Sequence, residues 1–214
     1  MITDFDRSHW FGASDAKYIF SADTSSKSWQ AFWKVKCGFD VQDFKGNIYT
    51  KAGNTFEHSI LRAFDPSIQF DRQIKIPKLR LRVNLDGNTE DEIFEVKTYQ
   101  IDKQFKVKDE YFLQAQLQMF AWKYESYIDF ADCEGVPELK KKNPELKRHT
   151  ILAYGLFPDE YYGAYTYEQI ENGLIEVDPK RIKTYEIGRS RGYERKARKI
   201  LRKLSARLER EELK

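Results

Sequence analysis

Residues 79–99, with the sequence LRLRVNLDGNTEDEIFEVKTY, decide the fold of this 214-residue chain. Every second residue from Leu79 to Leu85 is apolar, which is typical of a β-strand that buries one face. Residues 92–99 form a second strand-like run, and the Asp-Gly-Asn sequence at 86–88 predicts a turn between the two. The stretch therefore predicts an antiparallel hairpin.

Two charged residues, Glu95 and Lys97, interrupt the otherwise apolar second strand. Residues two apart in a strand point to the same face, so these side chains project together, and the hairpin can bring Asp86 beside them. Mg²⁺ prefers carboxylate ligands, and a bound metal assists phosphodiester hydrolysis by stabilising charge and acidifying water. A lysine can orient or deprotonate that water where cationic neighbours depress its pKa. A cross-strand salt bridge is the structural alternative, and the spacing alone leaves both open.

Helical and strand-like segments surround the hairpin. Their order is helices, sheet, helix, strands and helix, which predicts an α/β or α+β fold with one central sheet. The expected helices cover residues 14–37 with a polar break at 23–28, then 51–64 and 108–124, and the chain from Gly192 to its end; further strands are expected at 68–76, 149–157 and 182–187, with another short element at 161–167.

The composition indicates one globular domain over residues 1–214, with a basic C-terminal helix at 189–214 packed on it or extending from it. Apolar residues make up 41% of the chain, which is enough for a core, and the net charge is only +3. The two cysteines, Cys37 and Cys133, form no CxxC pair; they indicate free thiols in a reducing compartment and are too few for an iron–sulfur cluster. The N-terminus lacks an apolar signal region, and no apolar run approaches the length of about 20 residues that spans a bilayer, so we expect a cytoplasmic protein of a phage, a prophage or a bacterial host cell.

Four other segments occur in a fixed order around the Asp-Gly and Glu-x-Lys motifs. They are Gly12-Ala13-Ser14-Asp15 with Arg7 before it, the aromatic and basic run 29–38, Gly53-Asn-Thr-Phe-Glu57, and the run 111–119 with Tyr111, Gln114 and Gln116. With these motifs, residues 7–124 resemble the PD-(D/E)XK nuclease superfamily, and most closely the phage lambda-type exonucleases and the YqaJ-like viral recombinases. The resemblance implies a restriction-endonuclease-like core, in which a central mixed sheet is flanked by helices. Beyond residue 124 it rests only on the strand-then-helix pattern.

The resemblance also implies roles for the central residues. Asp86 and Glu95 would bind the metal together with the Val96 carbonyl, and Lys97 would position or activate the attacking water. Glu57 would be a carboxylate of the metal site or its surroundings. An exposed helix carboxylate is the alternative for Glu57, whose neighbour His58 points about 100° away around the helix.

A glutamine and a phosphate-binding pair complete the expected site. Gln114 would orient the lysine, the water or the scissile phosphate; Gln116, which lies on the opposite helix face, is the weaker candidate. Ser14 and Arg7 would hold the 5′-phosphate of a DNA end, because a helix N-terminus offers free N–H groups and arginine offers a forked donor. The structural alternatives are a plain N-cap for Ser14 and a solvated charge for Arg7.

Aromatic and basic segments offer further DNA contacts. Trp29, Phe32 and Trp33 could stack on an unpaired end, although their helical spacing is more typical of a core. The tail from Arg189 carries an apolar stripe, so we expect it to dock on the rest of the chain. Its basic face, like the lysines at 140–142, either contacts phosphates or is simply solvated. The stripe consists of Ile200, Leu201, Leu204 and Leu208.

We therefore expect a Mg²⁺-dependent 5′→3′ exonuclease that acts on double-stranded DNA ends, with Mn²⁺ able to substitute. By resemblance, it would act in phage-type recombination or DNA end resection for a single-strand annealing protein, and could form a ring-shaped homo-oligomer. The alternatives are a RecB-like or Cas4-like nuclease or an endonuclease of other specificity, and a nuclease fold that binds DNA without catalysis.

Overall fold

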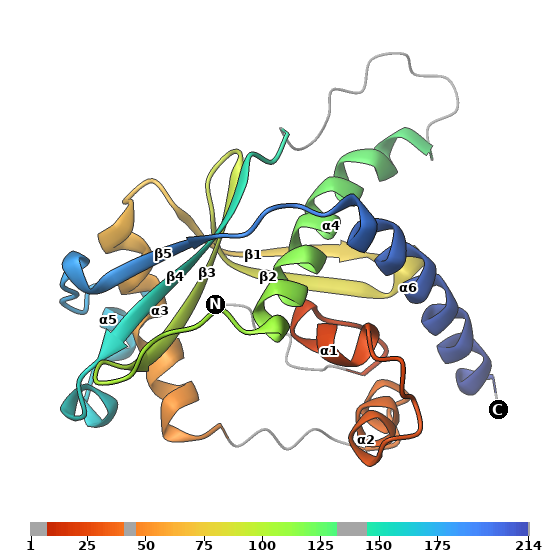
Figure 1. Ribbon diagram of the computed structural model, residues 1–214, viewed down its shortest axis with the longest axis horizontal. Helices are drawn as coiled ribbons and strands as arrows, with labels where there is room; N and C mark the ends of the chain where they lie inside the picture. The colour runs from red at the N-terminus through yellow and green to blue at the C-terminus, as the bar shows by residue number, and fades with distance from the viewer. Residues whose placement is uncertain (1–7, 41–45, 132–144, 214) are drawn as a thin grey trace.

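The computed structural model describes residues 8–40, 46–131 and 145–213, without the side chains of 126–131. Its centre is a sheet of five strands in the order β1-β2-β3-β4-β5. β3 and β4 are parallel, and the other neighbouring strands are antiparallel. The predicted mixed sheet is therefore present (Figure 1). The strands are β1 (Gln69–Ile76), β2 (Leu81–Asn88), β3 (Glu92–Gln100), β4 (Arg148–Leu156) and β5 (Ile182–Glu186).

Helices cover both faces of the sheet. Because successive strand residues point to opposite faces, Phe94 and Leu152 belong to an apolar cluster with α3, whereas Ile93 and Ile151 belong to a second cluster with α4. The prediction of an α/β fold with flanking helices is confirmed. The helices are α1 (Ala16–Ile19), α2 (Lys27–Lys36), α3 (Ile48–Phe64), α4 (Asp109–Ala131), α5 (Tyr167–Glu171) and α6 (Arg191–Glu212).

β2 and β3 form a fork. They pair only at Gly87–Phe94 and Asn88–Ile93, and then diverge, whereas β3 pairs with β4 along its whole length. The prediction of a turn at 86–88 is wrong, because β2 continues through Asn88. The glycine serves packing instead: a Cβ at position 87 would lie 2.7 Å from Ile68 Cγ2 and 2.8 Å from Leu61 Cδ2. Gly87 thus lets α3 approach β2 beside the fork.

The N-terminal helices are shorter than expected. A 3-10 helix, Ala13–Asp15, precedes the four-residue α1, and Gly12 occupies the N-cap. The expectation that Ser14 is an N-cap is wrong, because the Asp15 carboxylate instead accepts a hydrogen bond from Gly12 N at 2.8 Å. In α2, Trp29, Phe32 and Trp33 are buried, which confirms the core interpretation, and Gly38 follows the helix with φ +72°.

α6 packs against α4 and the 3-10 helix Pro77–Leu79 (Figure 1). Its buried face consists of Ala197, Leu201, Ser205 and Leu208, with Ile200 and Leu204 partly buried, so the expected docking of the apolar stripe is confirmed. At the C-terminal end of α6, Glu212 forms a two-pronged ion pair with Arg80, at 2.9 and 2.6 Å. None of the described helices is both long enough and apolar enough to cross a membrane.

Candidate active site

The fork between β2 and β3 is filled by side chains rather than by backbone pairing. Asp86 lies on β2, and its Oδ2 accepts a hydrogen bond from the backbone N–H of Val96 on β3 at 2.8 Å. Glu95 and Lys97 flank Val96 on the same strand. The structure thus brings Asp86, Glu95 and Lys97 together where the two strands separate.

Glu95 is the centre of a hydrogen-bond network. Its Oε1 accepts from Lys97 Nζ at 2.5 Å and from Gln114 Nε2 at 2.6 Å, and its Oε2 accepts from Gln118 Nε2 at 2.6 Å. The predicted Lys97 and Gln114 therefore touch the predicted carboxylate. The structural alternative was a cross-strand salt bridge. The observed ion pair instead joins Glu95 and Lys97 within β3.

Gln118 and His149 belong to this network, and the sequence analysis missed both as site residues. His149 on β4 is completely buried, and its Nε2 lies 2.6 Å from Gln118 Oε1. Because Gln118 donates through its nitrogen to Glu95, its oxygen is left to accept, which places the imidazole proton on Nε2. Burial lowers the pKa of His149 to about 4, so the ring is neutral near pH 7.

Gln116, the weaker glutamine candidate, lies outside the site. Its Nε2 donates to Gly188 O at 2.7 Å, and its Oε1 accepts from Ser190 N at 2.9 Å. These two bonds hold the segment that leads into α6. This geometry agrees with the ranking of Gln114 above Gln116.

Glu57 on α3 faces the same carboxylates. Burial first, and then the charges of Asp86 and Glu95, raise the pKa of Glu57 well above its ordinary range. Burial and the charge of Glu95 likewise raise the pKa of Asp86 to about 7. Glu95 is also buried, but the charge and hydrogen bond of Lys97 outweigh this effect and lower its pKa. The site therefore holds more negative charge than its own cations compensate.

Lys97 is held in its charged form. Burial disfavours the ammonium group, but the charges of Glu95 and Asp86 outweigh burial and raise the pKa of Lys97 above its ordinary value. The expectation that cationic neighbours depress this pKa is not met, because the neighbours supplied by the protein are carboxylates. In the protein alone, Lys97 is thus a hydrogen-bond donor and not a base.

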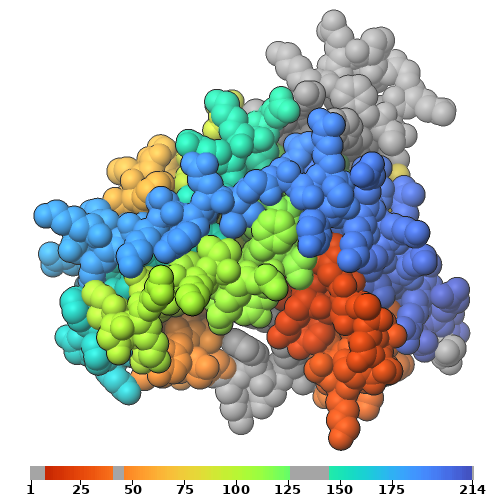
Figure 2. Space-filling view, viewed as in Figure 1, coloured from red at the N-terminus to blue at the C-terminus, as the bar shows by residue number. Residues whose placement is uncertain are grey.

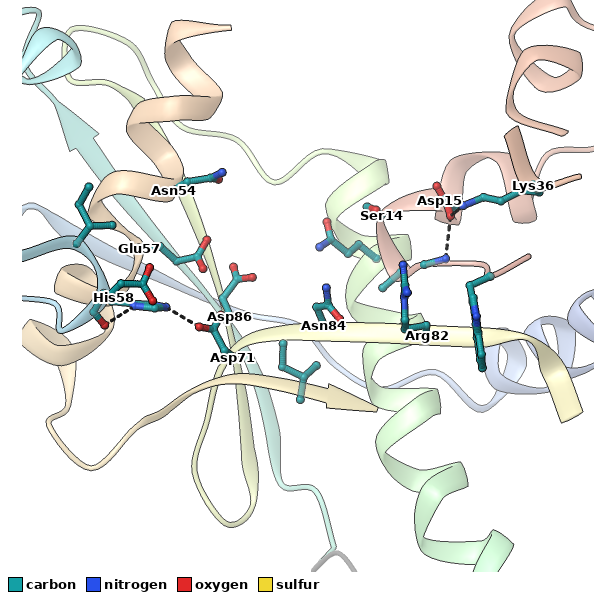
Figure 3. A pocket seen from close by; sticks show the side chains of 17 residues that line it. Ser14, Asp15, Lys36, Asn54, Glu57, His58, Asp71, Arg82, Asn84 and Asp86 are labelled. Carbon is teal, nitrogen blue, oxygen red and sulfur yellow. Dashed lines mark hydrogen bonds and ion pairs between the residues drawn. The ribbon is translucent and has the colours of Figure 1, made fainter. Parts of the chain in front are cut away.

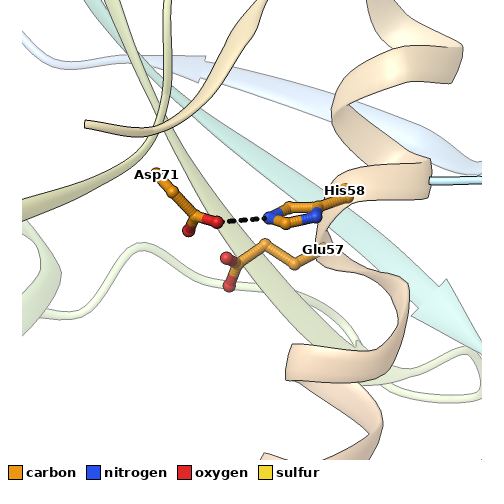
Figure 4. Close-up of side chains that lie close together, drawn as sticks. All are labelled: Glu57, His58 and Asp71. Atoms are coloured by element: carbon orange, nitrogen blue, oxygen red, sulfur yellow. Dashed lines mark ion pairs between the residues drawn. The ribbon is translucent and has the colours of Figure 1, made fainter. Parts of the chain in front are cut away.

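A further acidic residue, Asp71, approaches Glu57 from β1. It has φ +60°, and β1 and β2 keep the same register on either side of it although Asp71 and Asp86 do not pair, so the left-handed backbone redirects its side chain. His58 Nε2 lies 3.3 Å from Asp71 Oδ2, and His58 Nδ1 lies 2.9 Å from the Glu171 carbonyl. One potential ligand atom from each of Glu57, His58 and Asp71 falls within 4.8 Å of the others (Figure 4). From sequence, Glu57 was favoured over its neighbour His58, and Asp71 was missed, since no pattern marks a left-handed residue inside a strand.

A pocket of about 380 Å³ joins the carboxylates to the N-terminal region. Glu57, Asp71 and Asp86 lie at one end, and Ser14 and Arg82 lie at the other (Figure 3). In the space-filling view, an opening separates the red N-terminal helices from the orange part of α3 (Figure 2). The structure therefore places Ser14 in the same pocket as Asp86, although not at a helix cap, and Arg7 lies outside the described residues.

Two basic residues missed by the sequence analysis, Lys36 and Arg82, line the Ser14 end of the pocket. Both are buried, and Lys36 Nζ lies 2.7 Å from Asp15 Oδ2. Lys36 belongs to the aromatic and basic run already singled out, whereas Arg82 occupies one of the polar positions of the alternating β2 pattern. That alternation indicated a face of the sheet but not a pocket.

The donor set suits a hard divalent cation. Glu57, Asp86 and Glu95 present carboxylate oxygens, and burial first, then repulsion between these carboxylates, raises the pKa of Glu57 and Asp86; a cation would offset both effects. Carboxylate oxygens are also the ligands that Mg²⁺ and Mn²⁺ share. The residues present thus fit a divalent metal.

Comparison with known proteins identifies a domain family. The model of the YqaJ-like viral recombinase domain matches residues 5–125, which is more than half of the chain and includes the expected motifs from Arg7 to the run 111–119. No curated protein matches the chain in sequence.

Solved structures with a similar fold include exonucleases. The alkaline exonuclease LHK-Exo from Laribacter hongkongensis, in complex with dAMP, has a TM-score of 0.62 at 16% identity, and the match covers 96% of this chain and 90% of LHK-Exo. A phage-related exonuclease from Haemophilus somnus 129PT has a TM-score of 0.56 at 16% identity, and the match covers 94% and 96% of the two chains. The fold is therefore the restriction-endonuclease-like fold of these exonucleases.

Proposed function

The chain belongs to the YqaJ-like viral recombinase domain family, and on that premise we propose that it is an exonuclease that digests one strand of double-stranded DNA from a 5′ end. The observation that carries this proposal is the convergence of Glu57, Asp86, Glu95 and Lys97 at the fork between β2 and β3. A merely structural salt bridge would not require further carboxylates with raised pKa values beside it.

The proposed cofactor is Mg²⁺, with Mn²⁺ as a substitute. Asp86, Glu95 and the Val96 carbonyl would hold it, and Glu57 would supply a further carboxylate. A bound divalent metal would stabilise the negative charge that develops on the scissile phosphate and acidify a bound water. The uncompensated negative charge of the site supports this assignment.

The side chains around Glu95 have distinct proposed roles. Lys97, held in its charged form, positions the attacking water and stabilises negative charge on the phosphate. Gln114 shares Glu95 Oε1 with Lys97, so it fixes the carboxylate and orients the lysine. Both residues thereby keep the reacting groups at fixed positions relative to the carboxylates.

The 5′ end specificity is proposed from the shape of the pocket. Its Ser14 end lies apart from Glu57, Asp71 and Asp86, so a terminal phosphate held there would leave the neighbouring phosphodiester bond near Asp86. Ser14 offers a hydroxyl, and Arg7 would add a forked donor for phosphate oxygens. Arg82 at the same end supports an anionic occupant.

The biological setting follows from the family description alone. A viral recombinase domain with exonuclease activity would resect DNA ends in phage-type recombination, and a single-strand annealing protein would bind the exposed strand. A ring-shaped homo-oligomer that encloses DNA belongs to the same proposal. Sedimentation of the protein with and without duplex DNA would test the assembly directly.

The central experiment digests a linear duplex with 5′-phosphates beside a covalently closed circle, in Mg²⁺, in Mn²⁺ and in EDTA. We expect loss of the linear DNA only, with release of label from the 5′ end before the 3′ end, and no digestion in EDTA. Lys97→Ala should abolish digestion, whereas Lys180→Ala, an exposed lysine outside the site, should digest normally.

Each alternative function gives a different result. Digestion of the circle at the same rate would indicate an endonuclease, and early release of 3′ label would indicate a RecB-like or Cas4-like end specificity. Retention of DNA without any digestion would indicate a binding protein on a nuclease fold. Full activity of Lys97→Ala would refute the active-site assignment whatever the polarity.

A further inference from the structure

A second basic surface lies between α4 and α6, outside the active site. A groove of about 510 Å³ runs along α6, which is exposed at one edge of the molecule (Figure 2). Six cationic side chains of α6 line the groove: Arg191, Arg195, Arg198, Lys199, Arg202 and Lys203. We call this set the α6 groove.

The spacing of the helix explains why these cations share one side. They follow one another at intervals of one, three or four residues, so they lie on one broad face of α6. The opposite face is anchored by the buried Leu201 and Leu208. At a rise of about 1.5 Å per residue, the row from Arg191 to Lys203 is about 18 Å long.

No ion pair among the described residues neutralises the cations of the α6 groove. All six side chains are exposed, and none of them forms an ion pair with a residue that the structure describes. The acidic residue in the groove, Glu194, is already engaged with Lys123 at 3.1 Å and with Arg189 at 2.6 Å. Like charges at this spacing repel one another, so the row calls for an extended anion with several charges.

We propose that the α6 groove binds the phosphate backbone of DNA that extends beyond the active site. Duplex DNA advances about 3.4 Å per base pair, so a row of about 18 Å matches the backbone of about five base pairs. The inference rests on the proposed function in one respect, namely that the polyanion is DNA. It adds a surface on which the protein holds DNA away from the bond that it cuts.

The groove and the active site lie on different sides of α4. Gln114 and Gln118 project from α4 to Glu95, whereas Phe120, Lys123 and Tyr124 line the α6 groove. At about 100° per residue, each of these three lies at least about 120° around the helix from Gln118. DNA in the groove is therefore flanking DNA and not the scissile end.

The groove recognises backbone and not bases. Phe120 is only 2% exposed, and the Arg198 guanidinium lies over the Tyr124 ring, 5.4 Å from its centroid. Both rings are thus covered, and neither offers a surface on which a base could stack. Binding in the groove is therefore independent of base sequence and sensitive to salt.

The experiment measures binding without cleavage. Fluorescence anisotropy of a labelled 30-base-pair duplex is recorded in EDTA over a series of salt concentrations. The groove variant is Arg195→Gln/Lys199→Gln/Arg202→Gln. The control variant, Lys27→Gln/Lys196→Gln/Arg210→Gln, removes the same total charge from exposed positions that do not line the groove.

We expect the groove variant to bind at least about tenfold more weakly at low salt. Its slope of log K against log salt should fall by about 0.9 for each lost phosphate contact, whereas the control variant should keep the wild-type slope. Circular dichroism and thermal unfolding should be the same for all three proteins, because every substituted side chain is exposed. Duplexes of different base sequence should bind alike.

Equal affinity and salt slope in the groove and control variants would overturn the proposal. The proposal would also be overturned if the groove variant differed from wild type in molar mass by light scattering but bound DNA equally well. The groove would then be a protein–protein interface. The digestion assay with wild-type protein is separate. Loss of nuclease activity with intact groove binding would refute the proposed function, and normal digestion with no groove contribution would refute this inference alone.

Discussion

The Glu95 carboxylate accepts hydrogen bonds from three side chains, and one of them, Gln118, is itself held by His149. Gln118 uses its nitrogen for the carboxylate and its oxygen for the buried imidazole. If the amide were removed, Glu95 would keep Lys97 and Gln114 on Oε1 but lose the donor on Oε2, and the buried His149 would lose its bond to Gln118. The orientation of Glu95 therefore depends on a residue on α4 and a residue on β4.

Replacing Gln118 by leucine should destabilise the protein by about 1–3 kcal/mol, because it leaves buried polar groups without partners. It should also weaken Mg²⁺ binding by about 10–100-fold, since the carboxylate loses an orienting partner. Urea unfolding and titration calorimetry measure the two effects. A His149→Leu/Gln118→Leu double variant should cost less than the sum of the single variants; strict additivity would argue against the relay.

The raised pKa of Asp86 makes the metal-free protein sensitive to pH. Its folded value of about 7 lies above the ordinary value of 3.8, so between these limits the folded protein keeps a proton that the unfolded chain releases. The stability that Asp86 contributes is therefore present at low pH and lost as pH rises towards 7. In EDTA, the free energy of unfolding of Asp86→Asn minus that of wild type should therefore increase as the pH rises from 5 to 8, as measured by urea unfolding. A constant difference across this range would contradict the shift.

Most helices and strands could be predicted from the sequence, but the course of β2 at the fork could not. Apolar alternation predicted β2, the strand-like run at 92–99 predicted β3, and the expected helices at 51–64 and 108–124 correspond to α3 and α4. The Asp-Gly sequence at 86–87 is typical of a turn, but here the strand continues and the glycine admits α3. Only the tertiary packing of Leu61 against position 87 distinguishes the two cases, and no local pattern carries that information.

The missing site residues were hidden for a different reason. His149 lies about 50 residues beyond Glu95, and its strand is apolar enough to be interpreted simply as core. Asp71 enters the site through a left-handed conformation inside β1, which no alternation pattern anticipates. Sequence motifs in a fixed order made the other site residues predictable, namely Asp86, Glu95, Lys97, Glu57 and Gln114.

The contact between α3 and β2 can be tested at the glycine. A methyl group at position 87 would meet Ile68 and Leu61 at under 3 Å, so Gly87→Ala should cost about 1–3 kcal/mol of stability. Gly188→Ala is the matched control, since its Cβ would meet nothing within 4 Å. Denaturant unfolding compares them. Equal midpoints would show that α3 does not press on β2 at this point.

At the scale of the whole molecule, α6 joins parts that are distant in sequence. Its apolar face packs on α4, and its end pairs with Arg80 next to β2. Gln116 holds the segment before it through Gly188 and Ser190. The basic helix is therefore integrated into the fold and presents its cations from a fixed position.

Truncating the apolar anchor of α6 should destabilise the whole protein. Leu201 is completely buried, so Leu201→Ala should cost about 2–5 kcal/mol. Leu213→Ala, at a side chain that is 87% exposed, should change stability by less than about 0.5 kcal/mol. Thermal and urea unfolding measure both variants. A small effect at Leu201 would indicate that α6 is only loosely attached.

The fork also determines how the molecule unfolds. Two residue pairs alone join the β1–β2 hairpin to the rest of the sheet, so this joint is the place where partial opening should start before global unfolding. The amide of Val96 lies at this joint, where it donates to the Asp86 side chain and not to the backbone of β2. A cation that bridges Asp86 and Glu95 would connect the two sides, and hydrogen exchange at Val96 should then slow more than at amides in the paired middle of β3 and β4. The sparse pairing at the fork would thus make metal binding a source of folding cooperativity.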